Sequence, residues 1–478
     1  MGHRPLLAAL AACVLLLALT APASSARSLR LGFTDRDAYQ GSADDRTVAL
    51  RRTRGARASF VRILSGWPSI ATRRPPSRAD ARNPAWPGYR WQSLDAELSD
   101  VTAAGLVPVL SLTGAPGWAE GRNRPAVSPR APAGTWKPSP ARYRDFARAL
   151  GRRYSGSFRD PGTGSLLPRV RYLQGWNEPN LARYLSPQWE RRGRRFAAAS
   201  PGHYRRLQNA FYDGVKAANP GATVITAGTA PFGDPRVNGL RLAPARFIRQ
   251  LLCVRGRGRP VARRCPKVRF NAFSHHPYSV GGPTRRALNP DDVTVPDLRK
   301  LTRPLRAAQR RGTVRPRGRK ALWVTELSWD SRPPDPRGVP AARQARWLQG
   351  SFSVLQRQGV EAITWFHLRD EPRGEGYPFT FQSGVFFRGS SIESDRPKPS
   401  LRAFRFPFTA YRSGARARLW GLAPRRGRVV IEARRGGRWR VVKRLRARRG
   451  RGFKGRLRTA RGTRLRARQG GEVSLVWR

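Results

Sequence analysis

Short runs of apolar residues alternate with longer segments of helical periodicity along most of this chain. The apolar runs have the length and composition of buried strands. We predict eight such strands, over residues 29–33, 59–64, 106–112, 170–173, 222–228, 270–278, 321–326 and 362–367. The predicted helices between them have apolar side chains at helical spacing, and the main ones cover residues 47–57, 91–105, 140–154, 202–218, 295–310 and 344–358. Such alternation favours a parallel sheet, and eight repeats favour a closed barrel.

The pattern changes towards the end of the chain. Residues 412–478 contain short apolar runs, such as 428–432 and 439–442, which are separated by turns rich in arginine and glycine. Runs of this kind are typical of short antiparallel strands. We therefore predict an α/β fold, a (β/α)8 TIM barrel over residues 29–408, followed by a small all-β, sandwich-like domain over residues 412–478. The second domain could be a stabilising cap or a carbohydrate-binding module.

The first residues predict export. A basic start, an apolar run to about Thr20 and a small-residue segment to Ala26 are typical of a secretory signal peptide, here residues 1–26. Residues 10–13 also resemble a lipoprotein signal, which would place a lipid on Cys13 at the bacterial cell surface. The apolar run continues past Cys13, which favours a secreted protein instead. No later segment has enough consecutive apolar residues to form a transmembrane helix.

Two cysteines remain after the predicted signal peptide. Cys253 and Cys265 lie on either side of a loop rich in arginine and glycine. In an exported protein, such a pair is typical of a disulfide that closes the loop. Neither histidine nor a further cysteine lies nearby at metal-ligand spacing, so we predict a structural disulfide and no metal site.

The chain is strongly basic, with a formal net charge of +65. Such a charge is compatible with an anionic polymer as partner, and it predicts binding to anionic surfaces at low salt. The basic residues are mostly arginines spread over the whole chain, which a coding bias from a GC-rich genome also explains. Because no nucleic-acid-binding motif is present, we expect no specific nucleic-acid partner.

Two of the predicted strands lead into a glutamate. In the segment 172–180, Pro179 cannot continue a strand, so Asn177 and Glu178 would lie at its carboxyl end. Glu326 ends a second apolar run 148 residues later, which corresponds to three strand–helix units of roughly 45 to 50 residues each. In a barrel, the carboxyl ends of the strands surround one pocket, so both acids would face it. The alternative for the first site is a turn with a solvated glutamate.

Three motifs in this order resemble a known group of enzymes. Residues 176–179 (Trp-Asn-Glu-Pro) at the fourth strand, 276–278 (His-Pro-Tyr) at the sixth and 325–326 (Thr-Glu) at the seventh resemble retaining glycoside hydrolases of clan A, in particular families 39 and 5. The resemblance covers most of residues 29–408. It implies an enzyme that cleaves O-glycosidic bonds of an oligo- or polysaccharide by double displacement, through a covalent glycosyl-enzyme. The predicted signal peptide makes this an exported enzyme.

The resemblance also implies roles for single residues. Glu178 would be the general acid/base and Glu326 the nucleophile. Asn177 would bind the sugar hydroxyl next to the reacting carbon. His276 and Tyr278 would line the cleft, with the tyrosine hydroxyl holding Glu326 in place. Retention requires the two carboxyl groups about 5 Å apart, one protonated and one charged.

Further residues complete this prediction. Arg62, at the second strand, would keep Glu326 ionised, and Trp365 and Trp176 would contact sugar rings. The sequence departs from the clan after the third strand, where a histidine is common but only Ser111 and Thr113 are found. Several other tryptophans lie in loops or at strand ends, and we expect about half of all of them to be core residues only.

Some alternatives stay open. A non-catalytic barrel that binds carbohydrate or an anionic polymer is the second hypothesis for function. Nothing in the sequence indicates a metal or an organic cofactor. The sugar, the linkage and endo or exo action depend on the long loops at residues 68–87, 114–136 and 186–200. The sequence leaves the oligomeric state open.

Overall fold

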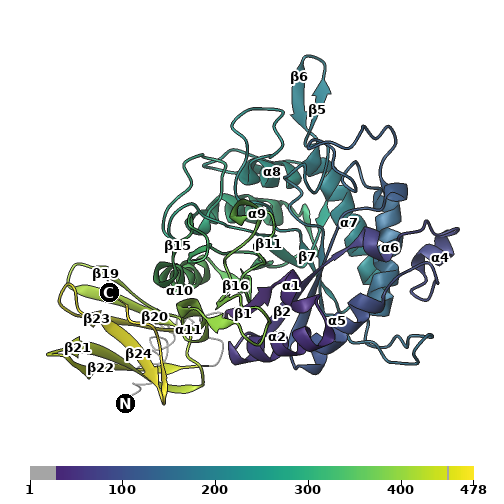
Figure 1. Ribbon diagram of the computed structural model, residues 1–478. Coiled ribbons are helices and arrows are strands. Elements are labelled where there is room, and N and C mark those ends of the chain that lie inside the picture. Colours follow the sequence, from purple (N-terminus) through teal and green to yellow (C-terminus); the bar gives the residue numbers. More distant parts are fainter. Residues whose placement is uncertain (1–27, 449–451, 478) are drawn as a thin grey trace, which may run out of the picture.

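A computed structural model of the chain describes residues 28–448 and 452–477. The predicted signal peptide and Cys13 lie outside the described residues. Within the described ranges, no helix is both long enough and apolar enough to cross a membrane. Figure 1 shows a barrel surrounded by helices, with a smaller all-β part beside it that contains the end of the chain.

The barrel consists of eight parallel strands, as predicted. They are β1 (Arg30–Thr34), β2 (Phe60–Gly66), β3 (Val107–Thr113), β4 (Tyr172–Gly175), β7 (Thr223–Thr226), β11 (Ala272–His275), β13 (Ala321–Val324) and β16 (Val360–Phe366). Each strand pairs with its neighbour in chain order, and β1 closes the barrel by pairing with β16. A right-handed helical connection between parallel neighbours explains this order.

Helices cover the outside of the barrel (Figure 1). The longer helices form this cover, and the helices of the described residues are α1 (Arg36–Tyr39), α2 (Ala43–Gly55), α3 (Trp67–Ile70), α4 (Arg78–Arg82), α5 (Gln92–Ala103), α6 (Pro140–Arg153), α7 (Ser200–Ala218), α8 (Pro244–Leu251), α9 (Arg299–Arg311), α10 (Ala341–Arg357) and α11 (Pro399–Arg405). Three single turns of 3₁₀ helix lie at Gly117–Ala119, Val295–Asp297 and Tyr377–Phe379. The predicted helices correspond to α2, α5, α6, α7, α9 and α10.

Short strand pairs lie in the loops between the barrel strands and helices. They are β5 (Trp189–Arg192) with β6 (Arg195–Ala198), β8 (Val254–Arg255) with β9 (Val261–Ala262), β10 (Val268–Arg269) with β12 (Val314–Arg315), β14 (Ser331–Arg332) with β15 (Val339–Pro340), and β17 (Phe386–Phe387) with β18 (Arg396–Pro397). The hairpin β5–β6 projects from the barrel at the top of Figure 1. The sequence pattern predicts the segments of β5–β6 and β8–β9 as loops and does not reveal the other pairs, because runs of two to four residues carry no periodicity.

The inside of the barrel changes from apolar to polar along its axis. One apolar layer contains a residue from each of seven strands, namely Phe60, Val109, Tyr172, Ile225, Ala272, Trp323 and Ala362. Side chains two residues further along a strand point to the same side. On β2, β3 and β4 these are Arg62, Ser111 and Gln174, all buried. The carboxyl end of the barrel is therefore polar within the protein.

The C-terminal part forms two antiparallel sheets that pack face to face. The first contains β19 (Phe408–Ser413), β20 (Arg416–Gly421) and β23 (Phe453–Arg458). The second contains β22 (Arg438–Ala447), β21 (Gly427–Arg435), β24 (Leu465–Gln469) and β25 (Glu472–Val473), in that order. Both sheets contribute to one apolar cluster, which includes Phe408, Leu419, Val429, Ile431 and Leu465. This arrangement is the sandwich that the sequence predicted.

The first of these sheets lies against the barrel. The backbone nitrogen of Phe408 donates to Gln349 on α10 at 3.3 Å, and Trp420 donates to Gln356 on the same helix at 2.6 Å. On the second sheet, Glu472 accepts from Arg57, which follows α2. The first sheet thus lies against α10, and the β25 end of the second sheet also contacts the barrel part.

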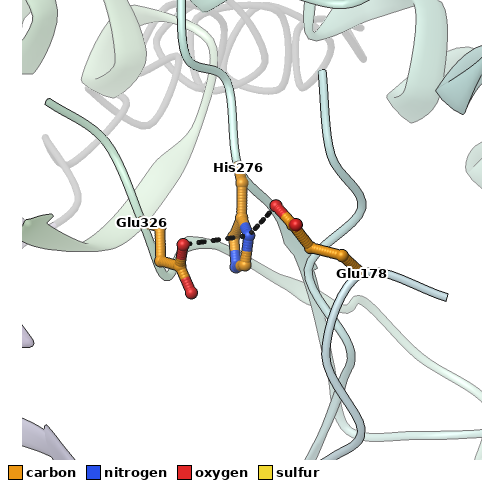
Figure 2. Close-up of side chains that lie close together, drawn as sticks. All are labelled: Glu178, His276 and Glu326. Atoms are coloured by element: carbon orange, nitrogen blue, oxygen red, sulfur yellow. Dashed lines mark hydrogen bonds and ion pairs between the residues drawn. The ribbon is translucent and has the colours of Figure 1, made fainter. Parts of the chain in front are cut away.

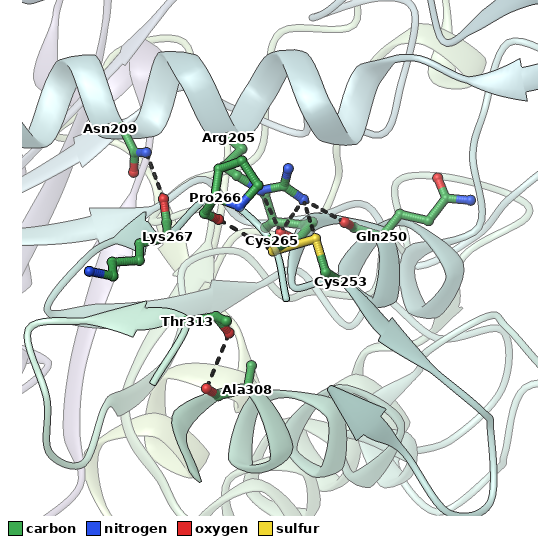
Figure 3. The surroundings of a disulfide bond; sticks show 10 residues. Arg205, Asn209, Gln250, Cys253, Cys265, Pro266, Lys267, Ala308 and Thr313 are labelled. Atoms are coloured by element: carbon green, nitrogen blue, oxygen red, sulfur yellow. Dashed lines mark hydrogen bonds between the residues drawn. A yellow bond between two sulfur atoms is a disulfide. The ribbon is translucent and has the colours of Figure 1, made fainter. Parts of the chain in front are cut away.

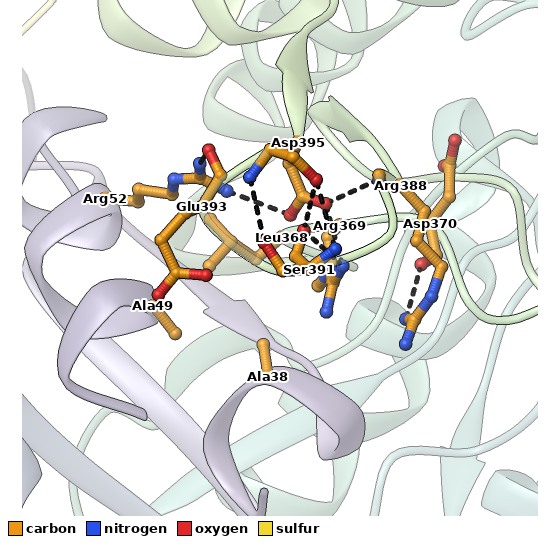
Figure 4. Close-up of polar contacts among 12 residues, drawn as sticks. Ala38, Ala49, Arg52, Leu368, Arg369, Asp370, Arg388, Ser391, Glu393 and Asp395 are labelled. Carbon is orange, nitrogen blue, oxygen red and sulfur yellow. Dashed lines mark hydrogen bonds and ion pairs between the residues drawn. The ribbon is translucent and has the colours of Figure 1, made fainter. Parts of the chain in front are cut away.

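A buried ion-pair network fixes the segment that follows the last barrel strand. Asp395 is fully buried and accepts from Arg369 at 2.7 Å and from Arg52 on α2 at 2.9 Å (Figure 4). The backbone nitrogen of Gly389 also donates to Asp395. This network ties residues 367–396 to the start of the barrel.

The predicted disulfide between Cys253 and Cys265 is present (Figure 3). It closes the loop that carries β8 and β9. Arg205 on α7 donates to the carbonyl of Leu251 and to the sulfur of Cys253. The bond therefore holds this loop on the outside of the barrel, where its role is structural.

Candidate active site

The loop after β4 has an unusual backbone at the predicted acid. Trp176 and Glu178 have φ angles of 82° and 34°, a region that side-chain-bearing residues adopt only when their surroundings enforce it. The buried amide of Asn180 enforces it here, since it bonds the backbone of Ala230 and Leu242. The backbone nitrogen of Glu178 donates to Gly228 at 3.0 Å. The position of Glu178 is thus set by the loop after the next strand.

Gly228 leaves room for the histidine at the centre of the site. A Cβ atom at this position would lie 2.1 Å from Nε2 of His276, a distance that no side chain allows. His276 is fully buried just beyond the end of β11. The absence of a side chain at residue 228 therefore lets the imidazole fit between the two acids.

Glu178, His276 and Glu326 converge at the carboxyl end of the barrel (Figure 2). Nδ1 of His276 lies 2.9 Å from Oε1 of Glu178 and 3.6 Å from Oε2 of Glu326. One oxygen of each carboxylate and a nitrogen of the imidazole all lie within 4.8 Å of one another. The structure thus brings together two acids that are 148 residues apart in the sequence.

Arg62 connects most of the polar groups in this layer. Its Nη1 donates to Glu326 at 2.8 Å and its Nη2 to Oδ1 of Asn177 at 3.1 Å. Its Nε donates to Ser111 at 2.8 Å and to Gln174 at 2.9 Å. All donor nitrogens of this buried guanidinium are engaged, which fixes the orientation of both Glu326 and Asn177.

The surroundings of the two acids push their pKa values apart. Burial is the main reason that the pKa of Glu178 is raised, and the charge of Glu326 adds to it. Burial would also raise the pKa of Glu326, but the charges of His276 and Arg62 and the hydrogen bonds from Arg62 and Tyr278 lower it overall. The hydroxyl of Tyr278 donates to Oε2 of Glu326 at 3.0 Å. The site thus favours a protonated Glu178 next to a charged Glu326.

The same three side chains are the candidates for holding a metal ion. Among the described residues, Glu178, His276 and Glu326 are the group whose possible metal-ligand atoms lie close enough together to hold one ion. Both imidazole nitrogens already have partners, since Nδ1 contacts Glu178 and Nε2 lies 2.9 Å from the hydroxyl of Thr325. The hydrogen bonds within the protein therefore account for the arrangement of these groups.

Two of the tryptophans expected to contact sugar are core residues instead. Trp365 is fully buried, donates to the carbonyl of Ser383 at 2.9 Å and packs against Trp329. Trp176 is also fully buried and donates to the carbonyl of Tyr184. Neither ring face is accessible, so we correct both assignments.

The reason for the first correction is the alternation along β16. Ala362 belongs to the apolar layer inside the barrel, so Thr364 and Phe366 share its side of the strand, and Trp365 points towards the helices. Phe366 is half-buried, and its ring lies edge-on to Tyr278 with centroids 6.3 Å apart. Phe366 is therefore the aromatic residue of β16 that adjoins the site.

Sequence reasoning missed several polar residues of the site. Gln174 accepts from Arg62 and donates to Thr325 at 3.2 Å, and Ser274 contacts the same threonine at 2.6 Å. Ser111, noted only as the residue present where a histidine is common, donates to Gln174. Alternation from the apolar layer could have identified them, because each lies two residues after a member of that layer.

Tyr184 is a further candidate that the sequence did not single out. Burial, followed by the charges of Glu178 and Glu326, raises the pKa of its phenol. The side chain is partly exposed, and its hydroxyl makes no hydrogen bond within the described part of the chain. It therefore lies close to the two acids with a free polar group.

Two of the long loops meet beside the acid. The segment that contains Trp136 bridges Ser186, and Ala182, four residues after Glu178, bonds the carbonyl of Leu240. These loops enclose a hollow of about 490 Å³. Its walls include Arg130, Trp136, Ala182, Trp189, Asn238 and Leu240. The loop that carries Glu178 is thus also a wall of this hollow.

Comparisons with known proteins support the fold. The structure is similar to that of a family 39 glycoside hydrolase from the gut symbiont Bacteroides cellulosilyticus WH2, with a TM-score of 0.52 and 16% identity over 91% of this chain and 81% of that chain. It is also similar to the GH39 enzyme from Xanthomonas axonopodis pv. citri, with a TM-score of 0.50 and 14% identity over 91% and 92% of the two chains. No family model and no curated protein matches the sequence. At this level of identity, the similarity establishes the TIM-barrel fold with its appended β-domain.

Proposed function

We propose that this protein is an exported retaining glycoside hydrolase, with residues 29–408 as its catalytic domain. The observation that carries the proposal is the pair of buried carboxyl groups with oxygens within 4.8 Å and with pKa values shifted in opposite directions. Retaining glycosidases need two such groups about 5 to 5.5 Å apart. The resemblance of the strand-end motifs to clan A points to the same reaction.

The mechanism follows from the contacts of each acid. The carboxylate of Glu326, held by Arg62 and Tyr278, attacks the anomeric carbon and forms an ester with the sugar. Glu178 protonates the departing glycosidic oxygen. Its Oε2 is free to do so, because this oxygen makes no hydrogen bond within the described residues, whereas Oε1 contacts His276. Glu178 then removes a proton from water, which attacks the anomeric carbon and releases Glu326.

Asn177 is placed to bind the sugar next to the reacting carbon. Its Oδ1 accepts from Arg62, so its amide nitrogen is directed away from that bond and has no partner among the described residues. A sugar hydroxyl can accept from this nitrogen. Phe366, and not Trp365, is the aromatic platform at the end of the eighth strand.

The substrate is an oligo- or polysaccharide in this proposal. The hollow whose wall includes Ala182, on the loop that follows Glu178, gives space for further sugar units, with the half-buried ring of Trp136 in its wall. An aromatic face and several polar groups in one hollow are typical of saccharide sites.

Replacement of the two acids tests the reaction. We expect E326Q to lower kcat by more than about 10⁴-fold on aryl glycosides, because the nucleophile is lost. E178Q should lower kcat/KM, which reports formation of the glycosyl-enzyme, by about 10²- to 10⁴-fold on alkyl glycosides, and by less on dinitrophenyl glycosides, whose leaving group needs no proton. The control E375Q makes the same glutamate-to-glutamine change at an exposed position and should retain full activity.

The opposite outcome is also clear. Turnover by E326Q within ten-fold of the unaltered protein would contradict the assignment of the nucleophile. Binding of saccharides without turnover of any glycoside by the unaltered protein would favour the alternative, a non-catalytic carbohydrate-binding barrel.

A further inference from the structure

The positive charge of the chain is concentrated in the C-terminal domain. Residues 408–478 contain 24 of the 94 lysines and arginines but only 2 of the 29 acidic residues. Both of these acids, Glu432 and Glu472, already pair with two arginines each. The remaining basic side chains in the described part of this domain therefore have no acidic partner within it.

The register of the second sheet places many of these arginines on one face. Val429, Ile431 and Ala433 of β21 point into the sandwich, so the residues between them point outwards. Residues directly opposite on β22 and β24 share that outer face. The arginines on it are Arg428, Arg434, Arg444, Arg446, Arg466 and Arg468, which we call the outer basic face.

Like charges lie directly opposite each other on this face. Arg428 pairs with Arg446, and Val430 has Arg444 on one side and Arg468 on the other. Like charges at opposite positions of a sheet destabilise it. Arg466 and Arg468 share Glu432, whereas Arg428, Arg434, Arg444 and Arg446 are exposed and have no acidic partner within the described residues. A bound anion would relieve the repulsion between these four.

The outer basic face is open to large ligands. The other sheet of the sandwich lies between it and α10, and β22 is the edge strand. In Figure 1, β21 and β22 lie at the lower left, away from the barrel. Neighbouring strands are about 4.8 Å apart and alternate residues about 6.6 Å apart. The guanidinium groups thus form a regular array that suits a polymer with repeated negative charges.

We propose that the outer basic face binds an anionic polysaccharide, and that it holds such a polymer while the barrel acts on glycosidic bonds. Arginine forks bind the carboxylate or sulfate groups of such a polymer through paired hydrogen bonds. The choice of a saccharide rests on the proposed function of the barrel.

The composition of the face favours a polysaccharide over a nucleic acid. Single-stranded nucleic acids bind to surfaces on which several aromatic rings stack with successive bases. The outer basic face has one aromatic residue, Trp439, and the guanidinium of Arg466 lies 4.1 Å from its ring centroid. Among the described residues of this face, no second aromatic side chain is available for a base.

Two triple variants of the full-length protein test the proposal. R428Q/R444Q/R446Q removes three exposed charges from the face, and R303Q/R306Q/R310Q removes three exposed charges from α9. The probes are polygalacturonate, single-stranded oligo(dT) with the same number of charges, and neutral dextran. Affinity is measured by fluorescence anisotropy or calorimetry between 50 and about 300 mM NaCl.

We expect the unaltered protein to bind polygalacturonate at least ten-fold more tightly than oligo(dT), and dextran not at all. The face variant should lose at least ten-fold in affinity for polygalacturonate. The slope of log affinity against log salt should fall in magnitude by about two. The α9 variant should stay within three-fold. Both variants should hydrolyse neutral aryl glycosides like the unaltered protein, which separates this site from the catalytic one.

Three results would overturn the proposal: equal losses in the two variants, no binding of polygalacturonate, or equally tight binding of oligo(dT). If the face binds polygalacturonate as expected but no glycoside is hydrolysed, the proposed catalytic function fails and the binding site stands.

Discussion

Arg62 and the arginines of the outer basic face carry the same guanidinium group, but Arg62 is buried and most of the others are exposed to solvent. Arg62 is fully buried, and each of its donor nitrogens has a partner in the protein. Arg428, Arg444 and Arg446 are exposed and lie opposite one another or next to other arginines. The first arginine organises groups within the molecule, and the others are directed to a ligand outside it.

This difference shows why the net charge of the chain says little about function. A buried guanidinium costs desolvation free energy that only close, well-oriented partners offset, so its contacts are specific. An exposed guanidinium is screened by salt and interacts weakly with any single partner. Only an array of such groups binds strongly, so the placement of the arginines matters and their number does not.

A matched pair of substitutions gives the largest expected contrast. R62Q and R444Q each remove one positive charge. R62Q should lower kcat by about 10²- to 10³-fold, because Glu326 loses its ion pair and Asn177 its orientation. R444Q should leave kcat within two-fold. Both effects are measured by steady-state kinetics on one aryl glycoside, with thermal unfolding as a check on folding. Equal kcat values in the two variants would contradict the distinction between the buried and the exposed arginines.

Asp395 represents a third situation, in which a buried charge pair has a structural role. D395A removes the shorter ion pair of the buried Arg369, which keeps only the longer ion pair with Asp37 at 3.5 Å, and it also removes the bond to Arg52. We expect a loss of about 3 kcal/mol in the free energy of unfolding, measured by urea denaturation. The comparison is D44A, since Asp44 lies exposed on α2 and should change this free energy by less than about 0.5 kcal/mol. An effect of D395A as small as that of D44A would contradict the network.

The pH dependence of catalysis gives a smaller but more specific effect. Activity should fall at low pH as Glu326 is protonated, and at high pH as Glu178, whose pKa is raised, loses its proton. Y278F removes a hydrogen bond to the charged form of Glu326, so the pKa of Glu326 rises and the acidic limb moves to higher pH. We expect a fall in kcat of about ten-fold, and an unchanged alkaline limb. An acidic limb that stays in place would show that Tyr278 does not hold Glu326.

The sequence was sufficient to predict the barrel because its signals are repeated. Eight apolar runs separated by periodic helical segments leave few alternatives, and β2, β3 and β13 begin within one residue of the predicted positions. The sixth strand is shorter than predicted, Ala272–His275 instead of 270–278, because its tip leaves the sheet to line the site. The short β-hairpins in the loops were not predicted, since two-residue strands depend on tertiary contacts.

The predictability of the site differs between residues for a physical reason. Glu178, Asn177, His276, Tyr278 and Glu326 follow recognisable strand ends, and the structure brings all of them together with Arg62. The two tryptophans were assigned by residue type alone, without the side of the strand on which they lie. Counting alternate positions from Ala362 selects Phe366 instead of Trp365. The hollow at Trp136 depends on how two irregular loops meet, which no local pattern contains.

Covalent labelling tests the central claim most directly. The protein is incubated with a panel of fluorosugar inactivators that trap glycosyl-enzymes, and the labelled peptide is then mapped by mass spectrometry. The account predicts a single label on Glu326, which is lost in E326Q and still forms in E375Q. A label on Glu178 or elsewhere, or a protein that turns over glycosides without ever forming a covalent adduct, would contradict the retaining mechanism and the assignment of the two acids.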